Sequence, residues 1–352
     1  MATSRGIDDA TAFPAEHRAA RRGRLTRRLL LAALIAVLLV AVLQATPWPA
    51  ALLIRGVFAQ GAAGTVAEMT PYVPAAGVDD LGTVAYAEGS PDTTLSAYSR
   101  SGSGALPAVV WIHGGAWISG DSGNVDPYLR ILAAEGYTAI GLNYTVGPEA
   151  VYPTAVGQLN EALAYIAAHA DELRVDPTRI VLAGDSAGAQ LASQLAVLTT
   201  NPEYSSLVGI EPALDPEQLV GTVLDCGVYD LDRMADLSGV VAWGFDASLW
   251  AYTGTKDWSA TYEGATMSTI DFVTPDFPPT YISGGNGDGL TWLQSVPMAE
   301  ALRAHDVEVT ELFWAEDHEP ALPHEYQFHL DYPEAQQALQ KTLDFMAVVT
   351  TR

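Results

Sequence analysis

The stretch RIVLAGDSAGAQLASQLAVLTT, residues 179–200, decides the fold predicted for this chain. Its first part, RIVLAGD, is an apolar run of strand length, and the remainder has the length and composition of a helix. Gly184 and Gly188 flank Ser186 where the two parts meet. A turn this tight leaves no room for side chains at either glycine, and it exposes the serine hydroxyl above the strand end. The helix N-terminus favours negative charge developing there. The pattern therefore predicts a nucleophilic serine.

Strand-like and helix-like segments alternate on both sides of this stretch. The strand-like segments are ALPAVVWIHGG (105–115), YTAIGLNY (137–144), LVGTVLDCGVYD (219–230), PPTYISGG (278–285) and VEVTELFW (307–314). Helical runs occupy 128–136, 154–170 and 334–349. This alternation predicts the α/β class, with a mostly parallel central sheet and helices on both faces. Right-handed crossovers then place the functional loops at the carboxyl ends of the strands.

A second motif, HGGAW, extends from His113 to Trp117 at the end of an expected strand. Consecutive glycines let backbone N–H groups point inward. An acyl-transfer enzyme needs such donors for its tetrahedral oxyanion. We expect Gly115 and Ala116 to supply two of them and Ala187, after the serine, to supply a third. His113 is expected to orient this loop.

HGGAW followed by GDSAG resembles the α/β-hydrolase superfamily, in its hormone-sensitive-lipase-like esterase branch. The resemblance covers roughly residues 80–350 and includes NYTVGPEAVYPTAV (143–156). It implies the α/β-hydrolase fold and a carboxylic ester hydrolase with a Ser-His-Asp triad and an acyl-enzyme. It implies no cofactor or metal. The chain departs from the branch at Gln158, where an Asp is usual, so no role is carried over there. It also departs at Ala116, where a strict HGGG has Gly, but the backbone N–H is retained.

The family order of nucleophile, acid and base directs attention to the loop after the strand PPTYISGG. Asp288 lies in that loop, in GNGDGL. Its expected role is to accept the Nδ1–H of a histidine and to fix the tautomer of that histidine. The alternative is a turn-forming aspartate between glycines.

The base is expected in EDHEPALPHEYQFHL, residues 316–330, which carries three histidines. Counting from the preceding strand favours His318, whereas counting back from the terminal helix favours His324. HEYQF also resembles a string of a membrane-anchored bacterial subgroup, and the intervening EPALP indicates an ordered excursion. We prefer His324, with His318 as the alternative, and assign His329 a solvated or capping role. The six-residue spacing fits no known metal-ligand pattern.

The N-terminus predicts an anchor or a targeting segment. Residues 1–28 carry seven arginines against three acidic residues, and LLLAALIAVLLVAVL (29–43) follows them. We expect a cytoplasmic basic tail at 1–28, a transmembrane anchor at 29–46 and a linker at 47–80. The catalytic domain, 81–352, would then lie outside the cytoplasm on a single-pass cell-membrane protein. A cleaved signal peptide, with secretion, is the alternative.

The net charge of −25 argues against a nucleic-acid partner, which needs a basic face. Cys226 is the single cysteine, so no intrachain disulfide can form, and we expect it to be buried. The aromatic-rich segment 229–278 is either a cap or pocket wall, or a packed helical excursion.

The expected partners are a small-molecule or lipid ester and a membrane. On the same fold, deacetylation of a polysaccharide or cleavage of a peptide remains an alternative. A membrane-tethered binding protein without turnover is the alternative from a different class.

Overall fold

The computed structural model describes residues 13–351 and contains two compact units, Met1–Pro49 and Ala50–Arg352. The first unit holds helix α1 (Phe13–Ala45). Large apolar side chains from Leu29 to Leu43 are exposed along it. Of the expected basic tail 1–28, residues 1–12 lie outside the described residues. Residues 13–28 belong to α1, which agrees with the high helix propensity of Ala, Arg and Leu.

The second unit is built on a sheet in which, within residues 13–351, eight strands follow the order β1-β2-β4-β3-β5-β6-β7-β8. The strands are β1 (Val78–Ala85), β2 (Thr94–Arg100), β3 (Leu106–Ile112), β4 (Thr138–Leu142), β5 (Val175–Asp185), β6 (Leu219–Asp225), β7 (Thr280–Gly284) and β8 (Val309–Phe313). β2 is antiparallel to both of its neighbours, β1 and β4. The other neighbouring strands, in the order β4-β3-β5-β6-β7-β8, pair in parallel. The mostly parallel sheet is therefore confirmed.

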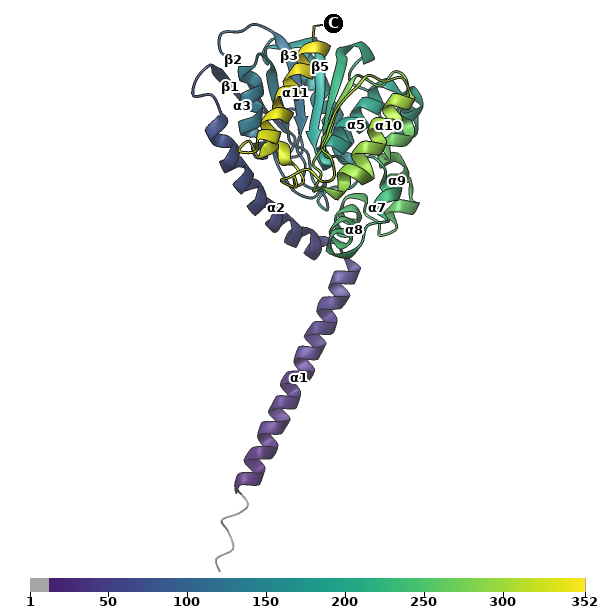
Figure 1. Ribbon diagram of the computed structural model, residues 1–352. Coiled ribbons are helices and arrows are strands. Elements are labelled where there is room, and N and C mark those ends of the chain that lie inside the picture. The colour runs from purple at the N-terminus through teal and green to yellow at the C-terminus, as the bar shows by residue number, and fades with distance from the viewer. Residues whose placement is uncertain (1–12, 352) are drawn as a thin grey trace, which may run out of the picture. The chain divides into compact units, whose positions relative to one another are not determined.

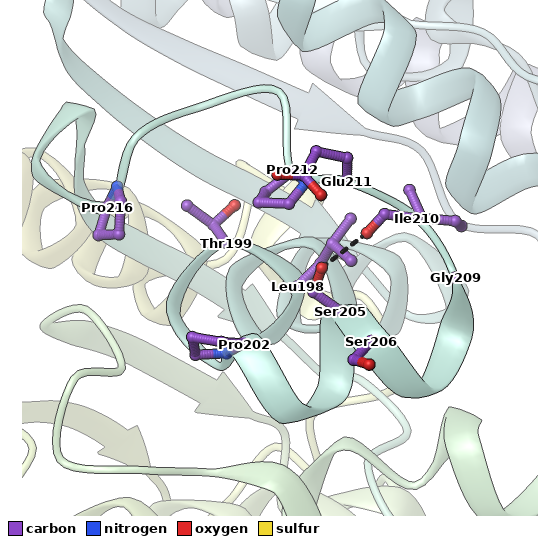
Figure 2. A pocket seen from close by; sticks show the side chains of 10 residues that line it. All are labelled: Leu198, Thr199, Pro202, Ser205, Ser206, Gly209, Ile210, Glu211, Pro212 and Pro216. Atoms are coloured by element: carbon purple, nitrogen blue, oxygen red, sulfur yellow. Dashed lines mark hydrogen bonds between the residues drawn. The ribbon is translucent and has the colours of Figure 1, made fainter.

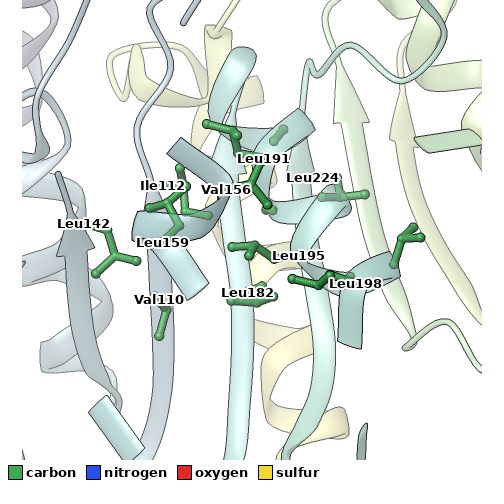
Figure 3. Packing of buried hydrophobic residues seen from close by; sticks show 14 of the residues in the cluster. Val110, Ile112, Leu142, Val156, Leu159, Leu182, Leu191, Leu195, Leu198 and Leu224 are labelled. Atoms are coloured by element: carbon green, nitrogen blue, oxygen red, sulfur yellow. The ribbon is translucent and has the colours of Figure 1, made fainter. Parts of the chain in front are cut away.

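Helices cover both faces of the sheet (Figure 1). The principal ones are α3 (Asp126–Ala134), α4 (Thr154–Ala168), α5 (Ala187–Thr200), α6 (Pro202–Val208), α10 (Val296–Ala304) and α11 (Pro333–Val349). Apolar side chains of α4, α5 and α10 pack with one face of the sheet, and those of α3 and α11 pack with the other. Figure 3 shows part of the first of these layers, in which Leu195 of α5 lies close to Leu182 of β5. Burial on both faces explains why the parallel strands are almost continuously apolar.

The segment expected to be a linker, 47–80, is instead ordered structure. It forms α2 (Trp48–Met69), the short helix Thr70–Tyr72 and the start of β1. Ala51, Ile54 and Met69 are buried, so one stripe of α2, which from Ala50 on belongs to the second unit, packs on the rest of that unit. Helical spacing of these residues provides the physical reason, because it places them on one side of the helix.

The segment 229–278 is a helical excursion rather than a plain loop. It contains α7 (Leu231–Met234), α8 (Gly239–Thr253), the short helices Trp258–Ala260 and Thr269–Phe272, and α9 (Tyr262–Met267). Tyr252 and Trp258 are buried, and the Tyr252 ring stacks on Trp117 with centroids 5.7 Å apart. Trp243 stays exposed. The segment is therefore packed and helical, and the carboxyl-terminal part of α8 lies beside the HGGAW motif.

Candidate active site

Ser186 lies at the junction of β5 and α5 in a strained backbone conformation with positive φ, at φ 53° and ψ −120°. A Cβ on Gly184 would stand 2.4 Å from the carbonyl carbon of Gly188, and a Cβ on Gly188 would stand 2.0 Å from the Ile112 oxygen. Neither position can hold a side chain. The Ser186 N–H donates to the Asp225 carbonyl oxygen at 2.8 Å, which ties the strained turn to β6. The geometry agrees with the tight turn expected from the sequence.

His324 and Asp288 meet Ser186 at the carboxyl edge of the sheet. The Nε2 of His324 is 2.9 Å from the Ser186 Oγ, and its Nδ1 is 2.7 Å from the Asp288 Oδ2. The other oxygen of Asp288 accepts the Leu290 N–H at 2.9 Å. Asp288 is buried, and the imidazole is partly exposed. Such a chain of hydrogen bonds can move a proton from a serine hydroxyl to an imidazole whose tautomer the carboxylate fixes.

The structure places the other two histidines of the 316–330 segment elsewhere. The Nε2 of His318 is 2.9 Å from the Glu334 Oε1 in the first turn of α11, and its ring lies against Trp314. His329 Nδ1 lies 2.5 Å from the Glu68 Oε2 on α2. Of the candidate bases, the structure brings His324 to Ser186.

The HGGAW loop has an unusual backbone. Gly115, Ala116 and Trp117 all have positive φ, at 110°, 51° and 59°. Within residues 13–351, no acceptor is bonded to the backbone N–H of Gly115, Ala116 or Ala187. Unbonded backbone N–H groups are the kind of donor that an oxyanion site requires.

His113 is buried and supports this loop without facing Ser186. Burial lowers the pKa of His113, so its ring is neutral and its Nδ1–H donates to the Gly114 carbonyl at 2.8 Å. Its ring stacks on Tyr144 with centroids 4.5 Å apart. These contacts agree with the orienting role expected from the sequence.

Two supporting residues were not singled out from the sequence. Asp185, the first of the two variable residues in the Gly-x-Ser-x-Gly pattern, accepts the Trp111 Nε1–H at 2.7 Å and the Gly114 N–H at 2.8 Å. Burial and the neighbouring Glu325 carboxylate raise the pKa of Asp185. The position of Asp185 beside Ser186 was the available signal.

Asn286, the second of these residues, holds the loop that carries His324. Its amide nitrogen donates to the His318 carbonyl at 2.8 Å, and its oxygen accepts the Leu322 N–H at 2.9 Å. The two bonds join the GNGDGL loop to the EPALP excursion. No sequence signal could have identified this pair of contacts.

Two further positions singled out from the sequence, Gln158 and Cys226, have structural contacts or burial that the structure describes. Gln158 bonds both the backbone N–H and the hydroxyl of Thr145, and so holds the loop after β4. Cys226 is buried directly after β6, as predicted. Burial raises the pKa of its thiol to about 11, so the thiol stays uncharged at neutral pH.

A hollow of about 630 Å³ lies away from this site (Figure 2). Leu198 and Thr199, near the carboxyl end of α5, line it together with residues of α6 and the segment that follows. The rise of 1.5 Å per residue puts Thr199 roughly 18 Å along the helix from Ala187. This hollow is therefore not part of the Ser186 site.

Comparisons with known proteins agree with this arrangement. The BD-FAE family model matches residues 97–302. The probable carboxylic ester hydrolase LipM of Mycobacterium tuberculosis is 28% identical over 192 residues, which span 54% of this chain but only 43% of LipM.

Solved structures of esterases show the same fold. Esterase B from Lactobacillus rhamnosis has a TM-score of 0.73 at 22% identity, and the match covers 87% of this chain and 96% of that one. An esterase from Pyrobaculum calidifontis has a TM-score of 0.67 at 20% identity, covering 85% of this chain and 94% of that one. These likenesses confirm the α/β-hydrolase fold. Because the family model covers more than half of the sequence, this chain belongs to the BD-FAE family.

Proposed function

We propose that this protein is a serine esterase that cleaves carboxylic esters through an acyl-enzyme. The carrying observation is the chain of contacts from Ser186 Oγ to His324 Nε2 and from His324 Nδ1 to Asp288. The ester-hydrolase and esterase names of its relatives support the same activity.

In the proposed reaction, Ser186 Oγ attacks the ester carbonyl while His324 Nε2 takes the hydroxyl proton. Asp288 stabilises the imidazolium, and the N–H groups of Gly115, Ala116 and Ala187 bind the oxyanion. Collapse of the tetrahedral intermediate breaks the ester C–O bond, and His324 returns its proton to the leaving alcohol. Water then repeats the sequence on the acyl-enzyme, which releases the acid and restores Ser186.

The test is covalent labelling with a fluorophosphonate, together with hydrolysis of p-nitrophenyl esters. We expect wild type to be labelled at Ser186, and Ser186→Ala to lose both labelling and turnover. Ser206→Ala, at a serine on α6, is the matched control and should behave as wild type. A folded wild-type protein that takes no label contradicts the proposal and favours a binding protein. Acetylated polysaccharide and peptide substrates, run beside the esters, test the two alternative reactions on this fold.

We further propose that α1 anchors the enzyme in the cell membrane with the catalytic domain outside the cytoplasm. Arg24–Ala45 is a 22-residue helical stretch of mean hydropathy 2.5, with none of it buried. A helix of this length spans roughly 30 Å, the thickness of the hydrocarbon core. Intact mass of the membrane-extracted protein tests this: the full chain supports an anchor, whereas loss of the first 45 or so residues indicates a cleaved signal.

A further inference from the structure

Helix α2 is in contact with the loop that carries two of the proposed oxyanion donors. Ala51 and Ile54, one helical turn apart, are buried in a small cluster with Ala116 and Ile118 of that loop. Ala247 and Ala251 of α8 complete the cluster. The start of α2 is therefore packed between the oxyanion loop and the helical excursion, next to α8 in Figure 1.

Arg55, the next residue after Ile54, bonds this loop directly. Its Nε donates to the Ile118 carbonyl at 2.7 Å, and its Nη2 donates to the Gly147 carbonyl at 2.9 Å. Both terminal nitrogens also reach the Glu149 carboxylate, each at 2.7 Å. Gly147 in turn donates its N–H to the Trp117 carbonyl at 2.8 Å. One guanidinium thus joins α2, the oxyanion loop and the loop after β4.

The oxyanion loop needs such support because of its backbone. Ala116 and Trp117 have positive φ, which residues with a Cβ rarely adopt unless their surroundings enforce it. On the α5 side, the Trp117 Nε1–H donates to Gln190 at 3.0 Å, and the Gly114 N–H donates to Asp185. On the opposite side, Arg55 provides the charged contact to a loop carbonyl.

We propose that Arg55 is a positioning residue that holds the oxyanion loop in its working shape, so that α2 is a functional part of the active site. This inference rests on the proposed esterase function. The donors on Gly115 and Ala116 stabilise the oxyanion only at hydrogen-bonding distance, so a small displacement of the loop weakens both at once. The planar guanidinium bonds two carbonyls and a carboxylate simultaneously, which a lysine ammonium cannot reproduce.

The test compares Arg55→Met with Arg130→Met in the full-length protein. Arg130 is a matched control: it pairs with Asp126 and Asp80 and has a similar side-chain exposure, 29% against 27% for Arg55. We expect Arg55→Met to lower kcat about 10- to 100-fold with KM within about 2-fold, and Arg130→Met to leave both unchanged. Arg55→Lys should recover only part of the loss, and Glu149→Gln should cost less than Arg55→Met.

Two further readouts separate positioning from general destabilisation. Affinity for a trifluoromethyl ketone, whose adduct needs the oxyanion site, should fall in Arg55→Met in parallel with kcat/KM. Amide hydrogen exchange at Ala116–Ser119 should accelerate in this variant but not in Arg130→Met. Wild-type kcat in folded Arg55→Met, or a loss explained by its unfolded fraction, overturns the proposal. If wild type hydrolyses no ester yet exchange still accelerates, the proposed activity fails while the contact with the loop survives.

Discussion

Two histidines, His318 and His324, lie six positions apart on the segment between β8 and α11, and each pairs with a carboxylate through a different ring nitrogen. His324 gives Nδ1 to Asp288 and keeps Nε2 for Ser186, with distances of 2.7 and 2.9 Å. His318 gives Nε2 to Glu334 at 2.9 Å. The difference teaches that the position of the carboxylate decides the role of the ring. A carboxylate on Nδ1 leaves the outer nitrogen available for proton transfer, whereas Glu334 occupies that nitrogen in His318.

The largest expected effect separates the two rings directly. His324→Ala should lower ester kcat/KM about 10³-fold or more, because Ser186 then has no proton acceptor. His318→Ala should stay within about 3-fold of wild type, since its ring contacts Glu334 and Trp314. Initial rates on a p-nitrophenyl ester, with circular dichroism to confirm folding, provide the measurement. A dead His318→Ala variant beside an active His324→Ala variant would reverse the assignment of the base.

Substitutions of the two carboxylates, Asp288 and Glu334, should differ in their effect on kcat as those of the two histidines do. Asp288→Asn keeps the size of the side chain but removes the charge that orients and stabilises the His324 imidazolium, so kcat should fall about 10²-fold or more. Glu334→Gln should leave kcat within about 2-fold of wild type. Equal losses in the two variants contradict the comparison, because they imply that both pairs serve the reaction.

The choice between the two histidines shows where sequence reasoning ended. Strand–helix alternation and the Gly-x-Ser-x-Gly context were enough to predict the sheet and the place of Ser186. Spacing alone left His324 and His318 open, because the EPALP excursion is held by contacts remote in sequence. A Cβ on Gly285 would stand 2.4 Å from the Leu322 carbonyl oxygen, so this close approach depends on a glycine in the neighbouring loop.

Arg55 could not have been predicted for a related reason. Its partners include the carbonyl oxygens of Ile118 and Gly147, which every residue type offers. A contact with a backbone carbonyl requires no particular residue type, so the sequence does not indicate it. Gly56, Gly61 and Gly64 also lower the intrinsic helix propensity of the α2 sequence.

The pH dependence of the reaction should report His324 and not His318. Burial lowers the pKa of His324, but the negative charge of Asp288 and its hydrogen bond to the ring raise it well above the usual value. Because the base must be neutral, kcat/KM should rise with pH through a midpoint above about 6.5. Asp288→Asn removes the negative charge, so the midpoint should move to lower pH. His318→Ala should leave the midpoint unchanged. A midpoint that moves in this variant contradicts the assignment of His324 as the base.

The smallest effect concerns stability and belongs to the pair that lies away from Ser186. The partly buried contact of His318 with Glu334 ties the EPALP excursion to the first turn of α11. His318→Ala should therefore lower the free energy of unfolding by about 1 kcal/mol, measured by urea denaturation. His305→Ala, at an exposed histidine that follows α10, is the control and should change it by less than about 0.5 kcal/mol. A double-mutant cycle with Glu334→Gln then isolates the pair, because a coupling energy near zero means that the lost stability came from the Trp314 contact instead.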